Sequence, residues 1–96
     1  MMSGAEIISK LEAVIRAKGV LWINGEYLRD GEVVRWECFV RWREAVVRVG
    51  FDEYLEKYED AVDLYDAYVR EEFPDIPSAL VFVLKSFPRV AEEMRK

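Results

Sequence analysis

The chain has no histidine, and this absence removes several kinds of active site. A Ser-His or Cys-His nucleophile system needs an imidazole, and so does a zinc site with histidine ligands. The single cysteine, Cys38, cannot form an internal disulfide, so no disulfide framework supports the fold. Catalysis would have to rest on carboxylates, lysine or tyrosine alone. We therefore expect no enzyme, no cofactor and no metal site.

Other absences bear on the temperature at which the protein works and on its location in the cell. Glutamine and threonine are missing and Asn24 is the only asparagine, while Arg, Glu and Val are frequent, a composition typical of hyperthermophile proteins. No apolar run approaches the roughly 20 residues that span a bilayer. The start, Met-Met-Ser-Gly-Ala-Glu, lacks the basic region and apolar core of a signal peptide. These absences predict a cytoplasmic protein with no membrane partner.

The net charge of −5 is unevenly distributed over the 96 residues, a length that suits a single domain over 1–96. Residues 1–50 hold eight basic and seven acidic side chains, whereas 51–75 hold two basic and ten acidic ones. An acidic protein is not a generic nucleic-acid binder. Because the acidity is concentrated in one segment, the rest of the chain is still compatible with a mildly basic surface.

The first half of the chain predicts a helix followed by a small sheet. Ser3 and Glu6 form a capping-box pattern, apolar residues follow at helical spacing, and Gly19 suits the end of this helix. The pairs Asn24-Gly25 and Asp30-Gly31 are typical of tight turns between antiparallel strands. From Val34 to Arg43 apolar and polar residues nearly alternate, which favours a strand over the competing helix across 33–49.

The second half predicts helices. Asp52 can cap a long helix that ends at Pro74, and its many carboxylates indicate a solvated face rather than an Mg²⁺ or Ca²⁺ site. Ser78 can cap a very apolar helix over 79–85, and 89–96 suits a final amphipathic turn or two. We predict an α+β domain: an N-terminal helix, a small antiparallel sheet of three to four strands, and two to three helices packed on it.

Arginines and aromatic residues alternate in the predicted strand around Phe39. Arginine can pair with phosphates and aromatic rings can stack on unpaired bases, so this pattern suits a surface for single-stranded nucleic acid. Phe39 would share the wet face with arginines, and Trp22 or Tyr27 of a neighbouring strand could join it. The same residues would also make an ordinary half-buried strand, or a protein-binding surface. The candidate nucleic-acid-binding residues are Trp22, Arg35, Phe39, Arg41, Trp42 and Arg43, with Trp42 the weaker candidate because its parity points inward.

The segments 21–25 (Leu-Trp-Ile-Asn-Gly) and 35–43 (Arg-Trp-Glu-Cys-Phe-Val-Arg-Trp-Arg) carry a resemblance to a known family. With the small size, the composition and the predicted order of elements, the chain resembles the ThermoDBP family of archaeal single-stranded-DNA-binding proteins. The resemblance implies an aromatic cleft flanked by basic residues that binds single strands without sequence preference. It also implies a homodimer through a C-terminal leucine zipper. No zipper heptads occur here, so the chain is either the DNA-binding domain alone or a zipperless relative.

The function we expect is therefore sequence-independent binding of single-stranded DNA, with RNA as a further ligand and a role in DNA replication and repair. Trp22 and Phe39 would stack on bases, and Arg35, Arg41 and Arg43 would contact phosphates. The alternative is a non-enzymatic protein–protein interaction module of a hyperthermophile.

Overall fold

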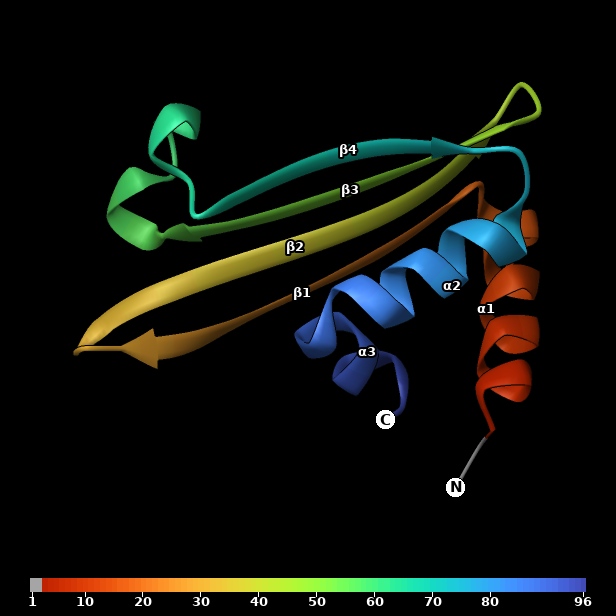
Figure 1. Cartoon of the computed structure of the whole chain (residues 1–96), viewed down its shortest axis with the longest axis horizontal. Helices are drawn as coiled ribbons and strands as arrows, with labels where there is room; N and C mark the ends of the chain where they lie inside the picture. The colour runs from red at the N-terminus through yellow and green to blue at the C-terminus, as the bar shows by residue number, and fades with distance from the viewer. Residues whose placement is uncertain (1–2) are drawn as a thin grey trace.

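The computed structural model describes residues 3–96 and confirms the α+β architecture (Figure 1). The three helices lie on one face of a four-stranded antiparallel sheet, and the β1–β2 hairpin extends beyond them (Figure 1). The elements in chain order are α1 (Gly4–Lys18), β1 (Val20–Arg29), β2 (Glu32–Arg43), β3 (Val46–Leu55), η1 (Glu56–Tyr58), η2 (Val62–Leu64), β4 (Ala67–Phe73), α2 (Ile76–Ser86) and α3 (Pro88–Met94).

Helix α1 begins and ends where its sequence predicts. The Ser3 hydroxyl accepts a hydrogen bond from the Glu6 amide at 3.2 Å, which satisfies one of the free amides of the first turn. Gly19 adopts a left-handed conformation with φ of 80° and donates its amide to the Ile15 carbonyl. The helix buries Ile7 and Ile15 against the sheet.

The sheet is a simple meander in which each strand pairs with the next, in the order β1-β2-β3-β4. Asp30 and Gly31 both have positive φ, as predicted for the tight turn between β1 and β2. The predicted turn at Asn24-Gly25 is wrong, because β1 runs through it and Gly25 pairs with Trp36. A Cβ on Gly25 would lie 2.7 Å from the Trp36 indole, so this glycine admits a buried ring rather than a turn.

The long helix predicted to start at Asp52 is wrong. Strand β3 continues to Leu55, two short 3₁₀ turns follow, and β4 returns along β3 up to Phe73. In β4 the side chains of Ala67, Val69 and Phe73 are half-buried toward the helices, so a period of two governs the segment. Pairing with β3 outweighs the local helical spacing of the same residues. The carboxylates of 56–66 therefore lie on turns and not on one helix face.

The last two helices close the core. Asp75, rather than the predicted Ser78, caps α2 by accepting the Ser78 amide at 2.8 Å, and α3 starts at Pro88. The core contains side chains from all three α-helices and from β2 and β3, and Cys38 is buried within it. Its largest fully enclosed members are Ile7, Ile15, Ile76, Leu80, Val34, Val40, Val47, Val49, Val83 and Val90. Between residues 3 and 96 no helix is long and apolar enough to cross a membrane.

Candidate nucleic-acid interface

Among residues 3–96 no α-helix lies on one face of the sheet, and we call it the open face; the η1–η2 segment lies at one end of it (Figure 1). Strand β2 places alternate side chains on the two faces, with Val34, Trp36, Cys38 and Val40 buried under the helices. Arg35, Phe39, Arg41 and Arg43 therefore lie on the open face, as the alternation in the sequence predicted. The register of the sheet aligns these side chains with residues from the other three strands.

Trp22, Phe39, Gly50 and Arg70 face one another across β1 to β4, and we call them the aromatic row. The rings of Trp22 and Phe39 stack with centroids 5.6 Å apart and planes 18° from parallel. Trp22 is 51% exposed, so a large part of its ring faces solvent. The row offers flat aromatic surface on which bases can stack.

Gly50 is what lets the Phe39 ring lie flat on the sheet. A Cβ at position 50 would lie 2.1 Å from Phe39 Cε2, far inside van der Waals contact. The lack of a side chain at Gly50 thus leaves the room that the Phe39 ring occupies in the aromatic row. Beside the ring, a hollow of about 220 Å³ opens between Phe39, Arg48 and Arg70.

Arg70 ends the aromatic row on β4, and Tyr68 lies beside it on the same strand, opposite Asp52. The sequence prediction missed both. The Arg70 guanidinium lies 5.3 Å from the centroid of Phe39 and 4.1 Å from that of Tyr68, which is 54% exposed. Asp52 holds it through two hydrogen bonds of 2.8 and 3.2 Å, which raise the pKa of Arg70 above its ordinary value. Because its charge is paired and its plane is fixed, Arg70 serves as a further stacking surface.

A second line, the basic row, lies two residues further along the strands and contains Arg41 and Arg48, which face each other across β2 and β3. Arg43 follows near the end of β2. Neither Arg41 nor Arg43 forms an ion pair with any residue of 3–96. Arg48 meets Glu72 at 3.3 Å, but both side chains are more than half exposed, so the pair is weak. These guanidinium groups are available to an anionic ligand.

A third line, the acceptor row, lies on the other side of the aromatic row and contains Asn24, Glu37 and Asp52. Glu37 Oε1 accepts a hydrogen bond from the Tyr54 hydroxyl at 3.3 Å. Within residues 3–96 Glu37 has no ion pair. The open face therefore changes from basic to acidic across the aromatic row.

Three of the residues singled out in the sequence are placed differently from the rest. Arg35 lies on the open face, but it meets Glu26 at 3.6 Å and Glu56 at 3.3 Å. Trp42 faces the helices, where the Arg16 guanidinium lies 5.2 Å from its ring. The expectation that Tyr27 joins Phe39 is wrong. It lies on the helix side, where its hydroxyl donates to Glu53 at 2.8 Å.

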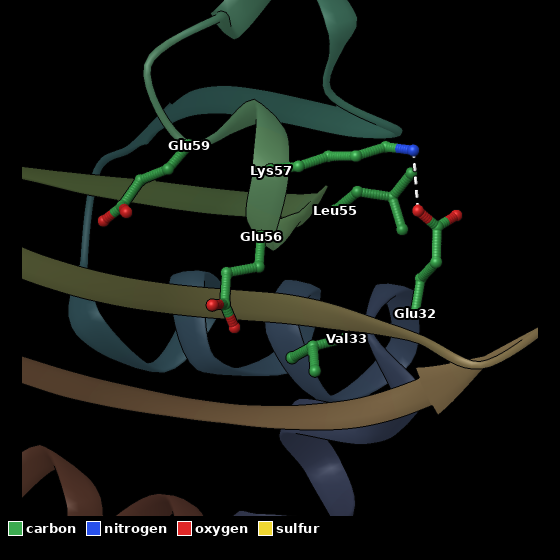
Figure 2. Close-up of a pocket in the computed structure, with 6 residues that line it drawn as sticks. All are labelled: Glu32, Val33, Leu55, Glu56, Lys57 and Glu59. Atoms are coloured by element: carbon green, nitrogen blue, oxygen red, sulfur yellow. Dashed lines mark ion pairs between the residues drawn. The ribbon is translucent and has the colours of Figure 1, made fainter.

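Another hollow, of about 380 Å³, lies at the far end of the sheet between β2 and η1 (Figure 2). Glu32 and Lys57 point toward each other across its rim and form an ion pair of 2.6 Å (Figure 2). Glu56 and Glu59 point away from that pair (Figure 2). Across residues 3–96 no group of three or more His, Cys, Asp or Glu side chains is placed to hold a metal ion.

Comparison with protein-family models, with curated proteins and with solved structures found no match to this chain. The resemblance to the ThermoDBP family therefore stays a prediction that rests on the sequence segments quoted above.

Burial beneath Tyr65 and the neighbouring Glu37 carboxylate raise the pKa of Tyr54 to about 12. Because the unfolded value is near 10, the folded protein binds more protons between about pH 10 and 12, and its stability should fall across that range. In a titration of tyrosinate absorbance we expect Tyr54 to ionise about two pH units late, whereas burial raises the pKa of Tyr27 and Tyr65 without setting them at this value. Tyr54→Phe should remove this late step, whereas a Tyr54→Phe protein that keeps it would contradict the assignment.

Proposed function

We propose that the chain binds single-stranded DNA, or RNA, across the open face without catalysing a reaction on it. Bases would stack on the aromatic row, and phosphates would lie against Arg41, Arg43 and Arg48. The observation that carries the proposal is the exposed Trp22–Phe39 stack directly beside arginines that have no carboxylate partner or only a weak one. Such a binder would act in the cytoplasm on strands exposed during replication and repair.

The preference for a single strand follows from what the face offers. Stacking requires bases whose faces are free, and in a duplex these faces are covered by neighbouring bases. Phosphate contacts alone would favour a duplex, but only a few arginines are free and the net charge is −5. The aromatic row therefore has to supply most of the affinity.

The proposal is tested by titrating the tryptophan fluorescence with a short mixed-sequence DNA strand over a series of salt concentrations. We expect saturable quenching, and affinity that falls as salt rises because bound cations are released from the strand. Arg41→Ala should reduce the slope of log affinity against log salt by about 0.7, the value for one single-strand phosphate contact.

Arg95→Ala is the matched control, because Arg95 follows α3 at the helix side of the molecule and is exposed. It removes the same charge and should leave the slope unchanged. An absence of binding by fluorescence and by gel mobility shift would refute the proposal, and equal slopes for both variants would remove Arg41 from the interface.

A second candidate is a protein-interaction module, favoured by aliphatic side chains exposed at the far end of the sheet. Leu28 is 73% exposed, and Val62 and Leu64 are about half exposed. Binding through such a surface should depend little on moderate salt, whereas phosphate binding should weaken steeply. The same salt series therefore separates the two candidates.

A further inference from the structure

The three rows of the open face would orient a bound strand, and this inference rests on the proposed function. The basic row lies on one side of the aromatic row and the acceptor row on the other. Successive rows are two residues apart along each strand, about 7 Å. A strand whose phosphates contact Arg41 and Arg48 while its bases stack on Trp22 and Phe39 must direct its base edges toward Asn24.

Glu37 is the acceptor that those base edges would meet. Asp52, its neighbour on β3, already has both carboxylate oxygens bonded to Arg70. Glu37 Oε1 is fixed by the Tyr54 hydroxyl, and Oε2 has no hydrogen-bond partner within residues 3–96. A carboxylate close to a bound polyanion repels it unless a donor reaches the carboxylate, so the position of Glu37 beside the aromatic row calls for a donor on the bound base.

There is room for a base edge at this carboxylate. A hollow of about 420 Å³ lies next to it, and Asn24, Arg35, Glu37 and Tyr54 are among the residues that line it. Tyr54 is only 5% exposed and stacks on Tyr65 with centroids 4.4 Å apart, which keeps its hydroxyl in place. The Glu37 carboxylate is thus a hydrogen-bond acceptor that is fixed in position at the edge of an open hollow.

We infer that the site prefers guanine, with Glu37 as the residue that reads the base. Guanine presents two adjacent donors on its Watson–Crick edge, the N1–H and the N2 amino group, and a carboxylate can accept both. Thymine and uracil present one N–H between two carbonyl oxygens, which a carboxylate repels. Adenine and cytosine each present one amino group and a ring acceptor. The site would therefore accept any single strand and favour one that contains guanine.

The test compares three DNA strands of equal length: all thymidine, thymidine alternating with guanosine, and thymidine alternating with inosine. Inosine lacks only the N2 amino group of guanosine. A lithium buffer disfavours guanine quadruplexes. We expect the guanosine strand to bind about tenfold more tightly than the thymidine strand, as is usual for one bidentate base contact, and inosine to lose most of that gain.

Glu37→Gln should bring the guanosine and thymidine strands to nearly equal affinity, because the amide replaces one acceptor oxygen by a donor. Glu92→Gln makes the same charge change on α3, at the helix side, and should keep the preference. Equal binding of all three strands by the wild type would overturn the inference and leave the proposed function intact. A preference that survives in Glu37→Gln would also overturn it, whereas no binding of any strand would refute the proposed function itself.

Discussion

Phe39→Ala should weaken the binding of a short single strand by about 1–3 kcal/mol, roughly a factor of 5 to 150 in dissociation constant. The ring stacks on Trp22 and has the guanidinium groups of Arg41 and Arg70 within 5.5 Å of its centroid. Its loss removes the central surface on which a base would stack. The slope of log affinity against log salt should hardly change, because no phosphate contact is lost.

The control for this variant is Trp42→Ala, since Trp42 is an exposed aromatic residue on the helix side of the same strand. It should bind the strand as the wild type does. Circular dichroism melting of both variants separates lost affinity from lost folding. Unchanged affinity in a folded Phe39→Ala protein would remove the aromatic row from the binding site.

Gly50→Ala should reduce affinity about tenfold while every aromatic side chain stays in the sequence. The new Cβ would lie 2.1 Å from the Phe39 ring, so the ring must leave its place on the sheet. Phe39 is half-buried on the open face and can move outward, which should keep the cost to folding small. The measurement is the same fluorescence titration. The loss of affinity should be no larger than the loss caused by Phe39→Ala.

Gly25→Ala is the matched comparison on the opposite face. Its Cβ would lie 2.7 Å from the Trp36 indole, which is buried in the core. This variant should lower the free energy of unfolding by about 1–3 kcal/mol, as overpacking usually does. A folded Gly25→Ala protein should bind normally. If Gly50→Ala bound as tightly as the wild type, the position of Phe39 over Gly50 would have no part in binding.

Local patterns in the sequence were enough to predict α1 and β2. The Ser3 cap, Gly19 and the apolar spacing between them define α1, and each acts on residues only a few positions away from itself. The alternation in β2 likewise placed Phe39 and Arg41 on the face opposite the core. These features could be predicted because their physical causes, capping and the two-residue period of a strand, are local.

The segment after Gly50 could not be predicted in the same way. Its tyrosines, valines and acidic residues fit a helical spacing, yet β3 and β4 satisfy their backbone groups by pairing with each other. That pairing joins residues that are distant in sequence, such as Phe51 with Val69. Because Arg70 and Tyr68 lie on β4, the error about this strand also hid these two residues of the candidate site.

The sequence by itself determined which residue types are available: aromatic rings, arginines, no histidine and a single thiol. It also determined that Phe39 shares a face with Arg41 while Trp42 does not. Only the tertiary structure decided that Trp22, Phe39, Gly50 and Arg70 form one row and that Glu37 stands beside it. The physical reason is that a row across a sheet is set by the register between strands, and register depends on long-range pairing and packing on the core.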